Sequence, residues 1–133
     1  MITMRKFTTG AAAAFLAAGL SGCNESLPAP TPYTTVTIAL TTPNTDDGAM
    51  LMVFTGLALS DVQASSAAYQ VFWRVAGPSE TRVIVVGDIV GGPVLTARAA
   101  GRATALTGTV TEVSTRGDQL RSTTTGYSLT ANN

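Results

Sequence analysis

The sequence predicts an all-β protein, a single antiparallel β-sandwich of seven or eight strands, and two observations carry this prediction. Threonine, valine and glycine dominate the chain after residue 32, and they favour pleated structure over helix. Short segments that alternate apolar and polar residues are separated by frequent turn clusters. A small barrel would give the same spacing, so this alternative stays open. The total of 133 residues suits one domain, which we expect to span residues 33–133.

The first part of this domain reads as two strands. Residues 34–41 (TTVTIALT) alternate cleanly, which predicts a half-buried strand. A turn cluster follows at 43–48 (PNTDDG). We expect a second strand over 50–59, interrupted near Gly56, and a short helical turn, if anywhere, in the small and polar residues 60–68.

The middle of the domain reads as a hairpin. Residues 69–76 (YQVFWRVA) alternate, with Trp73 on the core side and Phe72 on the outer side. The sequence GPSE at 77–80 predicts the turn. Residues 81–86 (TRVIVV) are almost continuously apolar, as in a strand that is covered on both faces.

Three further strands complete the set, over 94–99, 103–114 and 120–131, with a turn at 116–118. No internal repeat is visible. The predicted core consists of the inward residues of all these strands: Val36, Ile38, Leu40, Leu51, Val53, Val71, Trp73, Val83, Val85, Leu95, Leu106, Val110, Tyr127 and Leu129.

The first 22 residues have the layout of a secretory signal peptide. Arg5 and Lys6 give a positive start, and an apolar run of 11 residues follows at 10–20. This run is too short to cross a bilayer, which takes about 20 apolar residues. The leader ends in small residues at 20–23 (LSGC). We therefore expect export from the cytoplasm.

The sequence LSGC, at the end of such a leader, resembles the lipobox of bacterial lipoproteins. The resemblance implies cleavage between Gly22 and Cys23 and a diacylglyceryl group on the Cys23 sulfur. Each buried methylene contributes about 0.8 kcal/mol, so two or three acyl chains hold a protein firmly on a membrane. The alternative is an ordinary secretory signal that leaves a free thiol at Cys23. By the same resemblance, Asn24 favours the outer membrane or periplasm over the inner membrane.

Residues 23–32 then form a short tether. Pro28, Pro30 and Pro32 alternate with other residues, which favours an extended polyproline-type spacer. At ~3.1 Å per residue, the nine residues that follow Cys23 reach about 28 Å. The folded domain would therefore stay close to the lipid.

Two segments of the domain, DDGAMLMVF at 46–54 and RVIVVGDIVGGPVLTARA at 82–99, resemble strands of the cohesin and carbohydrate-binding-module group of β-sandwiches. The resemblance spans about 70 residues from Asp46. It implies a cohesin-like or immunoglobulin-like sandwich and suggests a role in binding protein or sugar. No binding residue can be carried over from it.

The composition argues against most kinds of catalysis. The chain has no histidine, and Cys23 is its only cysteine, which excludes an internal disulfide, a zinc site of Cys/His type and an imidazole-based triad. Nearly all carboxylates lie in predicted turns, where nothing would raise their pKa. The arginines after Cys23 are scattered and no lysine follows it, so we expect no nucleic-acid partner. We expect no enzyme activity, cofactor or metal.

Two groups of residues remain as candidate sites. Asn44, Asp46 and Asp47 crowd one turn, where they serve either turn formation or a weak calcium site. Phe72 and Tyr69 are the aromatic residues that we expect to face a ligand such as a sugar ring. Trp73 is in phase with the apolar positions of its strand and is therefore assigned to the core.

These observations favour a non-enzymatic, lipid-anchored protein with an interaction or structural role in the cell envelope. A carbohydrate-binding or cohesin-like module is the alternative. The expected partners are the membrane, through lipid on Cys23, and an envelope protein or a glycan. An exposed sheet edge would serve equally well to bind a strand of another protein.

Overall fold

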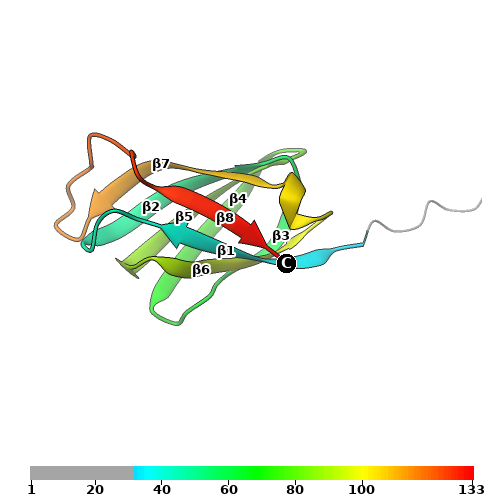
Figure 1. Cartoon of the computed structure of the whole chain (residues 1–133), viewed down its shortest axis with the longest axis horizontal. Coiled ribbons are helices and arrows are strands. Elements are labelled where there is room, and N and C mark those ends of the chain that lie inside the picture. Colours follow the sequence, from blue (N-terminus) through cyan, green and yellow to red (C-terminus); the bar gives the residue numbers. More distant parts are fainter. Residues whose placement is uncertain (1–31) are drawn as a thin grey trace, which may run out of the picture. The chain divides into compact units, whose positions relative to one another are not determined.

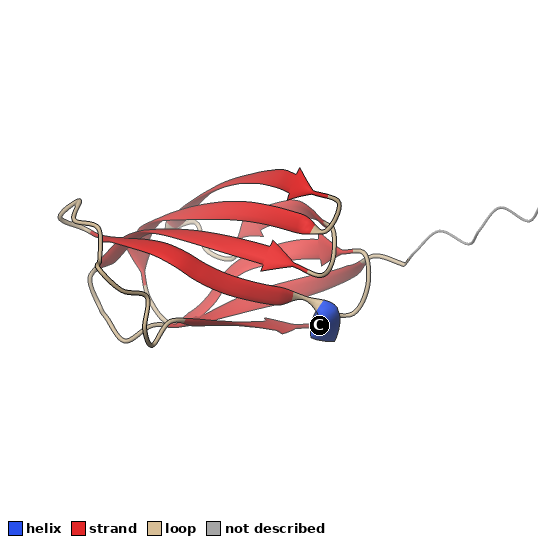
Figure 2. Ribbon diagram, turned by 90° about the horizontal axis from the view of Figure 1, so that it is seen from above, coloured by secondary structure: helices blue, strands red, loops and turns tan. Residues whose placement is uncertain are grey.

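A computed structural model describes residues 32–133 of the chain, and these form eight strands in two four-stranded antiparallel sheets (Figures 1 and 2). The prediction of an all-β antiparallel sandwich is confirmed. A single turn of 3-10 helix, η1 (Ala103–Ala105), is the one helical element of these residues. Within the same residues no helix has the length and apolar character that a membrane crossing requires.

The first sheet has the strand order β3-β6-β1-β8. Its strands are β1 (Thr34–Thr41), β3 (Leu59–Ala64), β6 (Gly92–Ala99) and β8 (Ser128–Asn132). Residues 34–41 form a strand with the predicted bounds. We call this sheet A.

The second sheet, sheet B, has the order β4-β5-β2-β7. Its strands are β2 (Asp47–Thr55), β4 (Tyr69–Gly77), β5 (Glu80–Ile89) and β7 (Thr107–Thr115). The predicted hairpin turn between β4 and β5 is confirmed. Because β4 and β7 have neighbours on one side only, they are the two edges of this sheet.

The core lies between the sheets, where alternate residues of the strands meet. The burial of eight predicted core residues is confirmed: Val36, Ile38, Leu40, Val83, Val85, Leu95, Leu106 and Val110. Three more pack partly buried against this cluster, namely Val71, Tyr127 and Leu129. These inward residues account for most of the core contributed by β1 and β5, whereas β6 also buries Val94, Ala97 and Ala99.

The predicted phase of β2 is wrong. Met50, Met52 and Phe54 are buried, whereas Leu51 and Val53 face outward and are half-buried. Every residue from Ala49 to Phe54 is apolar, so either alternate set suits the core, and a shift of one residue exchanges the faces. The outer face of sheet B thereby gains the apolar side chain of Leu51.

The helical turn expected within residues 60–68 does not form in the first half of this segment, and a hydrogen-bonded turn closes its end, where the Tyr69 N–H donates to the Ser66 carbonyl at 3.2 Å. Most of this segment's first half belongs to β3, with Leu59 and Val62 buried. β3 pairs with β6 and is irregular between Ser60 and Gln63, where Asp61 has a φ of 48°. The ladder with β6 satisfies the backbone groups that a helical turn would have paired internally.

β5 is not covered on both faces, contrary to the prediction. Thr81, Val83 and Val85 are buried, but Ile84 is 43% exposed and Val86 is 37% exposed. The near-continuous apolar sequence therefore reflects a buried inner face and an apolar outer face that no part of residues 32–133 covers. The outer face of sheet B therefore presents apolar side chains of β5 to solvent.

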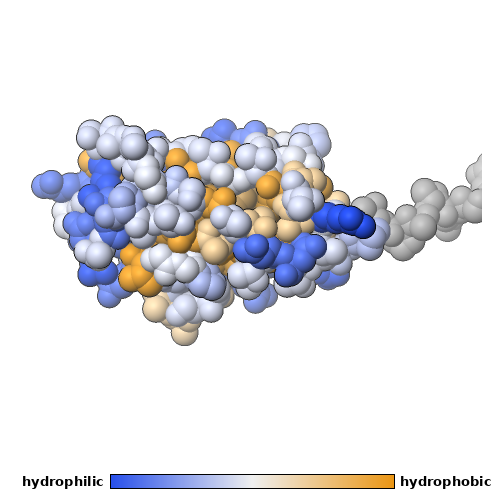
Figure 3. Space-filling view, viewed as in Figure 1, coloured by the Kyte–Doolittle hydropathy of each residue, from blue (hydrophilic) through white to orange (hydrophobic). Residues whose placement is uncertain are grey.

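The two ends of the sandwich are formed by different segments of the chain. Figure 1 shows the start of β1 and the C-terminus at one end, where the Thr34 hydroxyl donates a hydrogen bond to the Gly101 carbonyl. The loops before β2 and after β7 lie at the other end. In the same view, Figure 3 shows strongly hydrophilic residues at both of these ends.

Candidate binding face

The outer face of sheet B carries an apolar row that crosses three strands. Phe72 of β4 lies opposite Ile84 of β5, and Ile84 lies opposite Leu51 of β2. Phe72 is 59% exposed. An antiparallel sheet with one solvated face ordinarily carries polar residues on that face. This apolar row departs from that pattern, and contact with water gives no reason for apolar side chains at these positions.

The neighbouring row is cationic. Arg74 of β4 lies directly opposite Arg82 of β5, and like charges in this arrangement repel each other. The Arg82 Nε donates to Glu80 Oε1 at 3.1 Å. Within residues 32–133 Arg74 makes no ion pair. One guanidinium of the pair is thus available to an external anion.

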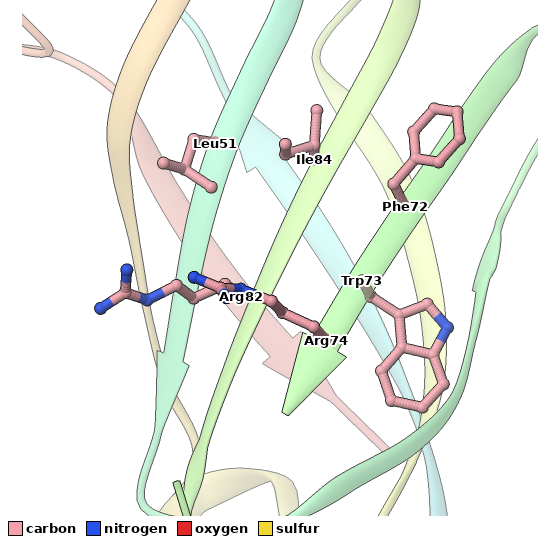
Figure 4. Close-up of a pocket in the computed structure, with 6 residues that line it drawn as sticks. All are labelled: Leu51, Phe72, Trp73, Arg74, Arg82 and Ile84. Carbon is pink, nitrogen blue, oxygen red and sulfur yellow. The ribbon is translucent and has the colours of Figure 1, made fainter. Parts of the chain in front are cut away.

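These two rows line an open groove with a volume of about 290 Å³. Its lining residues are drawn in Figure 4: Leu51, Phe72, Trp73, Arg74, Arg82 and Ile84. Ligand sites in proteins are commonly apolar with a few polar groups that fix orientation. Guanidinium groups bind carboxylates and phosphates in a bidentate manner. The groove therefore suits a ligand that combines an apolar or ring surface with an anionic group.

Trp73 was predicted to be core, and this is wrong, since its side chain is 40% exposed. Its neighbour on β5, Val83, is fully buried, which shows that Trp73 has the inward phase. Val75 has the same phase and is 60% exposed. Both residues belong to the edge strand, which the opposite sheet does not cover fully. The alternation along β4 predicted which face of the sheet these two side chains project from. It does not show that β4 is an edge strand.

Phe72 and Tyr69 were the expected ligand-facing aromatics, and their environments differ. Phe72 is exposed on the outer face, as its phase predicted, and its role in binding stays a prediction. Tyr69 is buried, and its hydroxyl accepts a hydrogen bond from the Val90 N–H at 3.3 Å. Its phase directs the ring into the core, so Tyr69 does not present a ring to a ligand.

Asn44, Asp46 and Asp47 belong to a hydrogen-bonded network at the far end of the sandwich. Asp47 is fully buried. Its carboxylate accepts hydrogen bonds from the Thr42 hydroxyl at 2.6 Å, the Tyr127 hydroxyl at 2.8 Å and the Arg121 Nε at 2.9 Å. Within residues 32–133 no three acidic, histidine or cysteine side chains are grouped to hold a metal ion.

The rest of this network completes the contacts of the turn. Asn44 Nδ2 donates to the Tyr127 hydroxyl at 2.7 Å, and Arg121 also pairs with Asp46. Burial alone would raise the pKa of Asp47, but the bonds from Thr42, Tyr127 and Arg121 hold that pKa below its ordinary value of 3.8. The hydrogen bonds that Arg121 donates to Asp46 and Asp47 raise the pKa of Arg121. The network joins the turn before β2 to residues 121–127.

The sequence did not reveal that Arg121 and Tyr127 belong to this network, because they lie more than 70 positions from Asp47 along the chain. The sequence shows a tyrosine in phase with the core at position 127 and a turn rich in Asx residues at 44–47, but nothing in it links the two. The predicted lipidation and cleavage site, Cys23 with Gly22, lies outside the described residues. Comparison of the chain with known protein families, curated proteins and solved structures gives no match.

Proposed function

We propose that this chain is a lipid-anchored protein of the cell envelope that binds a partner, without catalysis, through the outer face of sheet B. The observation that carries the binding role is the apolar row of exposed Phe72, exposed Ile84 and half-buried Leu51 next to two opposed arginines. The anchoring rests on the leader and on Cys23.

The apolar row supports binding because exposure of these side chains brings no stability to the isolated domain. Contiguous apolar surface that is bordered by polar groups marks interaction sites in soluble domains. Aromatic residues and arginine are also the residue types that contribute most to binding energy at interfaces. Phe72 and Arg74 are alternate residues of one strand and project from the same face.

The arginine row supports an anionic partner. Two arginines placed opposite each other cost stability in the free protein, whereas a bound carboxylate or phosphate would pair with Arg74, the one that has no acidic partner within residues 32–133. The leading candidate is therefore an envelope protein that presents an acidic side chain within an apolar segment. An acidic oligosaccharide is the second candidate, which the exposed ring of Phe72 favours.

Trp73 provides a direct test, because it is the only tryptophan of the chain and lines the groove. Acidic apolar peptides, acidic oligosaccharides and neutral oligosaccharides would be titrated against the protein while tryptophan emission is recorded. We expect a saturable shift with an acidic ligand, and an affinity at least about tenfold weaker in Arg74→Gln and in Phe72→Ala. Arg98→Gln, on sheet A, is the control and should bind normally.

Two results would contradict the binding role. One is the absence of a shift with every ligand in the panel. The other is a shift that survives both Arg74→Gln and Phe72→Ala, since the ligand would then lie elsewhere.

The anchor is tested separately by fractionation in a bacterial host that processes lipoproteins. Cys23→Ser should move the protein from the membrane fraction to the soluble fraction, because several acyl chains are lost. Ser26→Ala, in the same segment, is the matched control and should stay with the membrane. If the Cys23→Ser protein stays in the membrane fraction to the same extent, lipid on this residue does not hold it there.

A further inference from the structure

An unpaired sheet edge exposes a row of backbone N–H and C=O groups that other strands can pair with, and proteins commonly protect such edges. Residues 32–133 have four edges: β3 and β8 in sheet A, and β4 and β7 in sheet B. Three of them show protection. β3 has six residues and an irregular ladder, and β8 has five residues.

The edge of β7 is partly covered by the chain that follows it. The Arg121 N–H donates to the Val113 carbonyl at 2.8 Å, and the Thr115 N–H donates to the Gln119 carbonyl at 2.9 Å. The pairing of β7 with β2 also shifts register between Leu51 and Met52, which marks a bulge. A further strand would therefore fit poorly against β7.

β4 has none of these protections. It is nine residues long, pairs with β5 in regular register from Tyr69 to Val75, and contains one charged residue, Arg74. From Gln70 to Ala76, the backbone makes no hydrogen bond within residues 32–133 other than those of its ladder with β5. Exposed apolar side chains lie on both sides of the strand, with Phe72 on the outer side and Trp73 and Val75 on the inner side.

We propose that β4 pairs antiparallel with β4 of a second copy of this chain, with Trp73 at the two-fold axis. A two-fold axis perpendicular to the sheet keeps outer residues on the outer side, so each residue meets a residue of the same phase. Trp73 is the middle residue of Tyr69–Gly77. Centring the pair there aligns the whole strand with its copy, giving the longest overlap that two-fold symmetry allows.

The side chains suit this register. On the outer side, Phe72 lies opposite the partner's Arg74, a geometry for cation–π attraction that also gives Arg74 a neighbour of suitable chemistry. On the inner side, Val71 lies opposite the partner's Val75, and the two Trp73 rings meet. These contacts cover the inner-side residues that the opposite sheet leaves exposed.

The neighbouring symmetric registers are less favourable. Centring the pair on Arg74 places two arginines directly opposite each other, where they repel. Centring it on Phe72 shortens the overlap at both ends. The charge and the length of β4 therefore both favour Trp73 as the centre.

This inference rests on the edge of β4, whereas the proposed ligand groove rests on the outer face of sheet B, although Phe72, Trp73 and Arg74 contribute to both. The two are also compatible. Pairing through β4 would join the outer faces of two B sheets into one surface of eight strands, with the two grooves next to each other. A dimer that binds no acidic ligand, or a monomer that does, would separate the two proposals.

The first test is cysteine crosslinking of the full chain in isolated membranes. In the Trp73-centred register, the double variant Val71→Cys/Val75→Cys places each new thiol opposite one of the partner, so mild oxidation should give a disulfide-linked dimer. The control, Gln70→Cys/Arg74→Cys, has no opposed thiols in the Trp73-centred register, although it has them in the Phe72-centred and Arg74-centred ones, so it should remain monomeric, as should the unsubstituted chain. Crosslinking of the control alone, or of neither variant, would overturn the proposal.

The second test does not depend on introduced cysteines. In sedimentation velocity of the detergent-solubilised full chain, the unsubstituted protein should shift from monomer to dimer as its concentration rises. Val75→Lys, at an exposed position, should remain folded by circular dichroism but monomeric, because it places charge on the pairing edge. A protein that is monomeric throughout, or a Val75→Lys variant that dimerises as well as the unsubstituted chain, would contradict the proposal.

Discussion

Arg74 lies directly opposite Arg82 on the outer face of sheet B, and only Arg82 has an acidic neighbour, Glu80, at 3.1 Å. Opposed like charges destabilise a sheet by amounts similar to those that opposite charges contribute, about 0.2–1 kcal/mol. A residue that costs stability in the free domain but suits an anionic partner is typical of a functional surface. Replacing Arg74 should therefore raise the stability of the free domain and weaken its binding to an anionic partner.

Arg74→Thr should raise the free energy of unfolding by up to about 1 kcal/mol, because it removes the repulsion and places a good strand-former on β4. Chemical denaturation at low ionic strength measures this gain. The gain should shrink in 1 M salt, where the Debye length falls to about 3 Å. Gln70→Thr is the control and should show no dependence on salt. A less stable Arg74→Thr protein would mean that Arg74 makes a favourable contact in the free domain.

Tyr127→Phe should lower the free energy of unfolding by about 1.5–3 kcal/mol, because it removes a hydrogen bond to a buried carboxylate. The bond from the Tyr127 hydroxyl to Asp47 is 2.8 Å long. Denaturant unfolding at neutral pH is the measurement, and Tyr33→Phe, at an exposed tyrosine, is the control. Equal stability of the two variants would show that the network contributes little.

Stability should also fall as the pH is lowered, because the pKa of Asp47 in the folded protein lies below its ordinary value of 3.8. Above that value both states are ionised and the full contribution is present. As the pH falls further, the unfolded carboxyl takes up a proton before the folded one does, so the contribution is lost. Denaturant unfolding over this range should show a weaker pH dependence in Asp47→Asn. An identical pH dependence in the variant and the unsubstituted protein would contradict the assignment.

Thr81→Val should stabilise the domain by about 1 kcal/mol, because the Thr81 hydroxyl is buried and has no hydrogen-bond partner. For a domain of this size, that gain corresponds to a rise in Tm of roughly 4–8 °C. Calorimetry provides the measurement, and Thr130→Val, at an exposed position of sheet A, is the matched control. A lower Tm for Thr81→Val would mean that the hydroxyl has a partner.

Gly56→Ala should destabilise the domain more than Gly92→Ala, although both glycines have a positive φ, 97° and 115° respectively. The backbone conformation alone costs about 1–3 kcal/mol for a residue with a side chain. A Cβ at Gly56 would lie 2.3 Å from the Ala105 carbonyl oxygen, whereas nothing lies within 4 Å of one at Gly92. Denaturant unfolding of both variants isolates the steric part. Equal losses would show that the loop of Ala105 moves freely.

The fold class and the bounds of the clearest strands could be predicted because alternation and turn residues are local signals. The bounds of β1 needed only the alternation of Val36, Ile38 and Leu40 with threonines. The phase of β2 could not be predicted, because Met50 to Phe54 offer two equally apolar faces. A choice between them requires the neighbouring strands.

Tertiary position explains the other differences. Trp73 has the inward phase that the sequence indicates, but its exposure depends on β4 being an edge, which local pattern does not encode. In the same way, the sequence shows Asp47 only as a typical turn residue. Its ion pair with Arg121 depends on the tertiary fold. The exposure of the outer face of β5 could not be predicted either, because an exposed apolar residue such as Ile84 cannot be told from a core residue in the sequence.

The central claim is that lipid on Cys23 holds this sandwich at a membrane. The most direct measurement is the mass of the N-terminal peptide of the protein isolated from its native host. We predict that the mature chain begins at Cys23 and that this residue carries acyl chains. An N-terminal peptide that still contains residues 1–22, with an unmodified Cys23 thiol, would contradict the claim.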